Sequence, residues 1–158
     1  MKLKTLVAAF AVAALLPVSA LADTATGADK ANGARACKAL KTSLGAETFK
    51  STYGTNASKS NAMGKCVAAW TRAEHQNRHE AETACKAELP DAKRQELQRC
   101  IRAKQQAEST AERKATVKAA KTCKAERRTL GTAAFTAKYG TKRNAFGKCV
   151  SALAKSSS

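Results

Sequence analysis

Small apolar residues recur with helical spacing through the middle of this chain, separated by charged and polar residues. The segments 61–89 and 91–130 both show this spacing and are rich in Ala, Glu, Lys, Arg and Gln, which are strong helix formers. Neither segment contains a proline, and Pro90 stands between them. The pattern therefore predicts two long helices folded back as a hairpin, with Pro90 at the first position of the second helix.

The apolar seam of these predicted helices is narrow. Its members are mostly alanine and cysteine: Cys66, Ala69, Ala73, Ala84 and Cys85, then Leu97, Cys100, Ile101, Ala111, Ala115, Ala119 and Cys123. An alanine side chain buries little apolar area, at about 25 cal/mol per Å². Such a core is marginal for a single domain, so we expect disulfides to supply stability that packing lacks, and we expect little pocket volume.

The two ends of the chain carry matching patterns. The first contains Tyr53-Gly-Thr55 and then Asn61-Ala-Met-Gly-Lys-Cys66-Val67, and the last contains Tyr139-Gly-Thr141 and then Asn144-Ala-Phe-Gly-Lys-Cys149-Val150. Each end opens with Cys-Lys-Ala, and a reduced version of the pattern lies between them. These matches predict three repeat units, at about 37–67, 85–101 and 123–150.

Glycines divide the two outer units into short elements. Gly45 and Gly131 each follow a leucine at the end of a helical run, where a left-handed C′ residue is favoured. They predict short helices over 46–53 and 132–139, each ended by the next glycine. The Phe and Tyr of each short helix are four residues apart and so share one face.

A further helix is expected to close each unit. Asn61 and Asn144 are suitable N-caps, and a glycine follows three residues later in both units. Gly64 and Gly147 predict close packing against the helix that carries Cys37 or Cys123. The alternative is an anion site at the helix start, assisted by Lys65 or Lys148.

The outer segments resemble secreted bacterial proteins that share a Tyr-Gly-Thr…Asn-Ala-Phe-Gly-Lys-Cys-Val motif. The resemblance covers about 45 residues at each end, and the first copy departs from it with Met63 in place of the phenylalanine. It implies export and a cysteine-stapled helical module, and it brings no activity with it.

Together these patterns predict an all-α fold. The long antiparallel hairpin is flanked by helices at about 28–44 and 144–155, which form a partial four-helix bundle at its open end. Residues 1–22 are identified as a signal peptide, because a charged start precedes an apolar run and an Ala-Leu-Ala cleavage site. Residues 23–158 are then a single domain.

All six cysteines follow the signal peptide, and an exported chain meets oxidising conditions. The repeat pattern favours the pairs Cys37–Cys66, Cys85–Cys100 and Cys123–Cys149. The middle pair poses a difficulty, because its cysteines lie at unequal distances from the turn, with a mismatch of about 7 Å. The alternative is Cys66–Cys123 together with Cys37–Cys149.

The mature chain is strongly basic. Without residues 1–22 it holds 27 basic and 12 acidic residues, a net charge of +15 with histidine neutral. Four basic residues of the second long helix recur at helical spacing: Lys114, Lys118, Lys121 and Arg128. We call them the basic stripe. The stripe is expected either to bind an anionic cell-surface polymer or lipid headgroups, or to be a solvated face that keeps the protein in solution.

Other chemistry finds little support in the sequence. His75 and His79 are four residues apart on a predicted helix, but a third metal ligand at fixed spacing is missing, so no metal or cofactor is expected. No Gly-x-Ser-x-Gly elbow or paired carboxylates mark an active site, so we expect no enzyme. Few aromatic residues remain for base stacking, which argues against sequence-specific nucleic-acid binding. No membrane span is expected in the mature chain.

Three functions remain open. The first is a secreted or periplasmic bacterial protein that binds an anionic polymer or surface without catalysis. The second is a structural or protein-interaction module, with an unknown partner at the turn around Pro90 or at the Tyr-Gly-Thr loops. The third is a small cationic toxin or antimicrobial.

Overall fold

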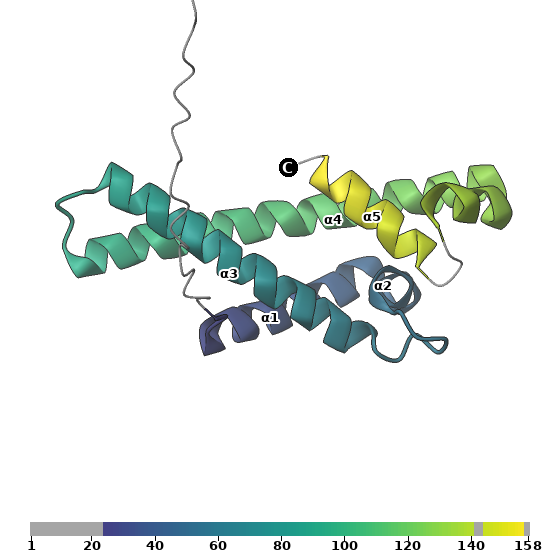
Figure 1. Ribbon diagram of the computed structural model, residues 1–158, viewed down its shortest axis with the longest axis horizontal. Coiled ribbons are helices and arrows are strands. Elements are labelled where there is room, and N and C mark those ends of the chain that lie inside the picture. The colour runs from purple at the N-terminus through teal and green to yellow at the C-terminus, as the bar shows by residue number, and fades with distance from the viewer. Residues whose placement is uncertain (1–23, 141–143, 157–158) are drawn as a thin grey trace, which may run out of the picture.

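Five helices make up the computed structural model, which describes residues 24–140 and 144–156. They are α1 (Gly27–Leu44), α2 (Ala46–Tyr53), α3 (Ala62–Glu88), α4 (Arg94–Tyr139) and α5 (Ala145–Lys155) (Figure 1). The predicted all-α fold is confirmed. The predicted signal peptide and Thr141 lie outside the described residues.

The predicted hairpin is formed by α3 and α4, and the shorter helices pack at its open end. Figure 1 shows α3 crossing in front of α4, with the turn between them at one end of the molecule. α1 packs chiefly on α3, and α5 packs chiefly on α4. Smaller contacts join α1 to α4 and α2 to α5, so the first and last segments of the chain meet.

The two glycines predicted to end helical runs share an unusual backbone conformation. Gly45 has φ 75° and ψ 157°, and Gly131 has φ 73° and ψ 164°. The positive φ agrees with the prediction, but ψ lies outside the left-handed helical region. α2 follows Gly45 as predicted, and Gly131 interrupts the helical dihedrals of α4, so that residues 132–139 form the predicted helical run after a kink. The rings of Phe49 and Tyr53 are 5.1 Å apart, and those of Phe135 and Tyr139 are 4.9 Å apart.

Two details of the helix starts differ from the prediction. Pro90 lies in the turn, and α4 begins only at Arg94, so Pro90 is not its first residue. Asn61 and Asn144 stand at the N-cap positions but make no side-chain capping bond. The side chain of Asn61 instead accepts from the backbone N–H of Thr55 at 3.0 Å, because the preceding loop folds back over the helix start.

Three disulfides form with the predicted pairing. Cys37–Cys66 joins α1 to α3, Cys85–Cys100 joins α3 to α4, and Cys123–Cys149 joins α4 to α5. The late start of α4 reduces the predicted mismatch of the middle pair. Cys100 now lies six residues into α4 while Cys85 lies three before the end of α3, an offset of about 4.5 Å.

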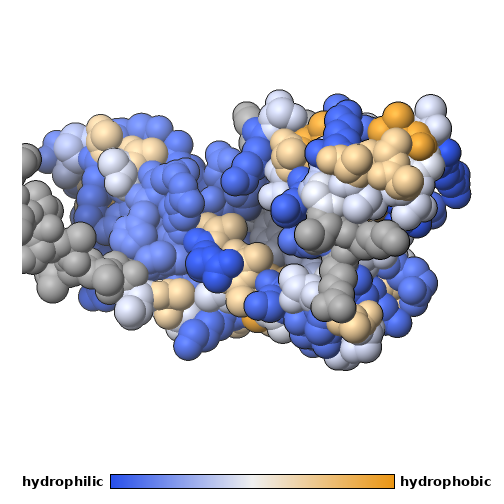
Figure 2. Space-filling view, turned by 45° about the vertical axis from the view of Figure 1, so that its right-hand side comes forward, coloured by the Kyte–Doolittle hydropathy of each residue, from blue (hydrophilic) through white to orange (hydrophobic). Residues whose placement is uncertain are grey.

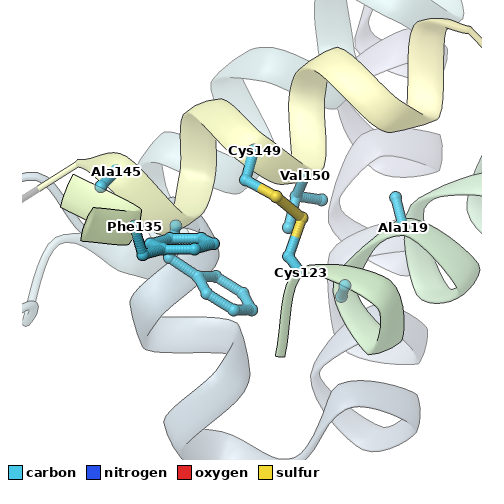
Figure 3. Packing of buried hydrophobic residues seen from close by; sticks show 8 residues of the cluster. Ala119, Cys123, Phe135, Ala145, Cys149 and Val150 are labelled. Atoms are coloured by element: carbon cyan, nitrogen blue, oxygen red, sulfur yellow. A yellow bond between two sulfur atoms is a disulfide. The ribbon is translucent and has the colours of Figure 1, made fainter. Parts of the chain in front are cut away.

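Each disulfide is the centre of its own small core. One cluster surrounds Cys123 and Cys149, a second surrounds Cys37 and Cys66, and a third contains Cys85 with Cys100 packed against it. In the first, Phe135 lies beside the Cys123–Cys149 disulfide (Figure 3), and Phe146 belongs to the same cluster with its ring centre 6.4 Å from that of Phe135. Of the buried apolar residues described, six are alanines and five are cysteines. The narrow core expected from the sequence is therefore present.

The matching glycines of α3 and α5 have different surroundings, contrary to the prediction. A Cβ at Gly64 would meet nothing within 4 Å, so this glycine is not at a close contact. A Cβ at Gly147 would come within 2.4 Å of the Thr52 carbonyl oxygen. Gly147 therefore packs against α2, and not against the helix that carries Cys123.

Alanine substitution at these two glycines should have opposite effects. Gly64→Ala places a strong helix former in open space and should stabilise the protein by up to about 1 kcal/mol. Gly147→Ala should destabilise it by about 1–3 kcal/mol, since backbone must move to admit the new atom. Urea unfolding of the oxidised proteins measures both, and equal effects at the two positions would contradict this packing.

Candidate functional site

The basic stripe borders a groove between α1 and α4. The groove has a volume of about 510 Å³, and its basic members are Arg113, Lys114, Lys118 and Lys121. α1 contributes small or apolar residues to the opposite wall, including Ala39 and Ser43. Among the described residues that line the groove, none is acidic. The groove therefore concentrates positive charge along one wall.

The members of the stripe are not all in one place. Lys114, Lys118 and Lys121 line the groove and are exposed, while Arg128 is exposed further along α4 and does not line it. The three lysines make no ion pair with a carboxylate in the described part of the chain. Their charges are thus available to a ligand.

Arg113 was missed by the sequence analysis. Its guanidinium bonds the Ser109 carbonyl at 3.3 Å and the Thr110 hydroxyl at 3.2 Å, so it is held against its own helix. Two features of the sequence could have indicated it. Arg113 is next to Lys114, and it is four residues before Val117, so it shares a helix face with that apolar residue.

A second cleft lies between α3 and α5, with α4 as its floor. Its volume is about 550 Å³. Small apolar residues of α3 and α4 line it together with Trp70, while Lys65, Lys148 and Lys155 contribute charge. Figure 2 shows apolar residues exposed in a hollow of this face, framed by hydrophilic ones. The two clefts contradict the expectation that alanine-lined helices leave little pocket volume.

The two clefts are on opposite sides of α4. The α4 residues in the second cleft are Glu112, Ala115 and Thr116, which share one side of the helix. Lys114 and Lys121 are turned roughly half a revolution away, at 3.6 residues per turn. A ligand in one cleft therefore does not occupy the other.

Polar residues are buried between α3 and α4, where the sequence predicted an apolar seam. The carboxylate of Glu74 is 3% exposed, and it accepts hydrogen bonds from Ser109 Oγ at 2.7 Å and Gln105 Nε2 at 3.2 Å. One turn on, Asn77 Nδ2 donates to Glu112 Oε2 at 3.1 Å. These hydrogen bonds satisfy polar groups that are removed from water where α3 packs on α4.

Glu112 is half-buried in this interface. Burial raises the pKa of its carboxyl group above the ordinary value. The hydrogen bond from Asn77 opposes the rise, and the nearby carboxylates of Glu74, Glu108 and Glu80 add to it. Ionisation of Glu112 therefore costs the folded state free energy.

The histidine pair belongs to a different contact, between α1 and α3. Asp29 is fully buried, with its carboxylate 3.6 Å from His75 Nδ1 and 3.4 Å from Arg78 Nε. Burial alone would raise the pKa of Asp29, but bonds from Thr26 and the charge of Arg78 outweigh it and lower the pKa. The His79 ring packs edge-on against His75 at 4.6 Å. The pair thus lies beside a buried ion pair.

No group of three potential metal ligands occurs among the described residues. Within the same residues, no helix has both the length and the apolar character required to cross a bilayer. Comparison with models of protein families, with curated proteins and with solved structures gives no match. The chemistry of the two clefts is therefore the basis for any functional inference.

Glu112→Gln should stabilise the protein at neutral pH. The amide keeps an acceptor for Asn77 and removes the ionisation cost. Because the folded-state pKa of Glu112 is raised, wild type regains stability as pH falls through that pKa, and the advantage of the variant disappears. Urea unfolding at pH 7 and at about pH 4 measures the difference. Glu108→Gln, at an exposed position of α4, is the matched control and should change stability less.

Asp29→Asn should show the opposite pH dependence. The pKa of Asp29 is lowered in the folded state, so its carboxylate stabilises the protein above the unfolded-state pKa, and this contribution is lost as pH falls through the folded-state pKa. The variant should be less stable than wild type at pH 7 and should approach it in acid. A deficit that does not change with pH would show that the ion pair contributes nothing.

Proposed function

We propose that this protein is an exported, non-enzymatic binding protein that holds an anionic cell-surface polymer in the groove between α1 and α4. The observation that carries the proposal is the groove itself, with four basic residues and no acidic one among the described residues that line it. Ordinary solubility requires neither a concave site nor charges of a single sign. The three disulfides of the protein are consistent with the oxidising compartment that export implies.

The arrangement favours a polymer over lipid headgroups. Lys114 and Lys121 are about 10 Å apart along the helix axis, and Arg128 lies about 10 Å further on. A line of charges in a groove suits an extended chain with anionic groups at intervals, whereas a bilayer surface requires a flat or convex basic face. The three lysines have no carboxylate partner within the described residues. They can therefore pair with anionic groups of the polymer and displace its counterions.

Charge reversal tests this proposal. The variant Lys114→Glu, Lys118→Glu, Lys121→Glu and Arg128→Glu should elute from a phosphorylated cellulose matrix at much lower salt than wild type. Four exposed basic residues at the other end of α4 provide the matched control: Lys93, Arg94, Arg99 and Arg102. Their reversal lowers the net charge by the same amount, and we expect a clearly smaller shift in elution. Equal shifts would show that net charge alone causes retention and that the stripe is a solvated face.

A further inference from the structure

The cleft between α3 and α5 combines an apolar floor with a basic rim. Ala69 and Ala73 of α3 and Ala115 of α4 leave the interior of the cleft open, and the buried ring of Trp70 forms part of the α3 wall. A volume of about 550 Å³ is within the range of pockets for small organic ligands, which is roughly 300–1,000 Å³. The shape therefore suits a compact molecule with an apolar body.

The charge at the rim comes from equivalent positions in the two similar ends of the chain. Lys65 is the fourth residue of α3 and Lys148 is the fourth residue of α5, and each stands between a glycine and a disulfide cysteine. Both are exposed, and neither has a carboxylate partner in the described part of the chain. The contact of Gly147 with the Thr52 carbonyl brings the start of α5 against α2, which places both lysines around one cleft.

Other groups in the cleft are compatible with an anion. The side chain of Asn144 makes no hydrogen bond with another described residue, so its amide is available as a donor. Glu112 is the one carboxyl group among the described lining residues, and its Oε2 is already bonded by Asn77.

We propose that this cleft binds a small amphipathic organic anion, with its carboxylate, sulfonate or phosphate between Lys65 and Lys148 and its apolar body against Trp70. The site is separate from the groove of the basic stripe, which lies on the other side of α4. The proposal does not depend on polymer binding, and either can fail without the other.

Trp70 is the single tryptophan of the chain and therefore reports directly on this cleft. The probe is 8-anilinonaphthalene-1-sulfonate, an aromatic anion, added to the oxidised protein while Trp70 emission is recorded. We expect saturable quenching with one equivalent of probe. N-phenyl-1-naphthylamine, its neutral analogue, should bind more weakly, because it lacks the group that the lysines would hold.

Two double variants locate the charge contribution. Lys65→Ala with Lys148→Ala should weaken binding of the sulfonate roughly tenfold or more and should leave the neutral analogue nearly unchanged. Lys114→Ala with Lys118→Ala removes the same charge from the other groove and should change binding less than about threefold. Equal weakening by both pairs would overturn the proposal, as would saturation without quenching of Trp70.

A third variant tests the apolar lining of the cleft. Ala69→Leu fills apolar space and should abolish binding of both probes, while a cooperative thermal transition shows that the protein remains folded. Full binding by a folded Ala69→Leu protein would place the probe elsewhere and contradict the proposal.

Discussion

The covalent pairing of neighbouring helices is the constraint on which the rest of this structure depends. Each of the three small cores contains one disulfide, and six of the thirteen other buried apolar residues described are alanines. The bridged cysteines are separated by 29, 15 and 26 residues. Loop-closure entropy assigns about 3 to 4 kcal/mol to each separation. Their sum is comparable to the whole stability of a typical domain, about 5–15 kcal/mol.

This dependence on disulfides also explains the clefts. Helices fastened at a few points do not need bulky side chains along their full length, so alanines can line the space between α3, α4 and α5. A core of Leu and Ile would close that space. Buried polar contacts take its place in the α3–α4 interface, where Glu74 is bonded to Ser109 and Gln105. Both clefts remain open, and lysines without a carboxylate partner among the described residues line each of them: Lys65 and Lys148 in one, and Lys114, Lys118 and Lys121 in the other.

The order of the helices and the disulfide pairing could be predicted from the sequence because both are encoded locally. Glycines mark the ends of α1 and α2, and the matching ends of the chain select the pairs of cysteines. The turn of the hairpin was harder to predict from the sequence. A proline is compatible with a turn as well as with a first helical position, and Pro90 lies in the turn.

The sites were harder to predict, because they depend on which side of a helix meets which neighbour. Gly64 and Gly147 occupy equivalent positions, yet only Gly147 meets another backbone, since α2 packs on α5. The basic stripe was identified as one face of a helix, but α1 packs beside this face and makes Lys114, Lys118 and Lys121 part of the wall of a groove. A helix face made of alanines fits several neighbouring helices equally well. The periodicity of the sequence therefore does not determine which helix packs against it.

The central claim is that three disulfides hold together helices whose apolar contacts are too few to do so alone. Thermal unfolding of residues 23–158 by circular dichroism, before and after complete reduction without denaturant, tests it most directly. We expect the oxidised protein, which has no free thiols, to unfold cooperatively. Reduction should lower the free energy of unfolding at 25 °C by roughly 10 kcal/mol, so the reduced protein should show no cooperative transition. A fully reduced protein that unfolds at the same temperature as the oxidised one would contradict the claim.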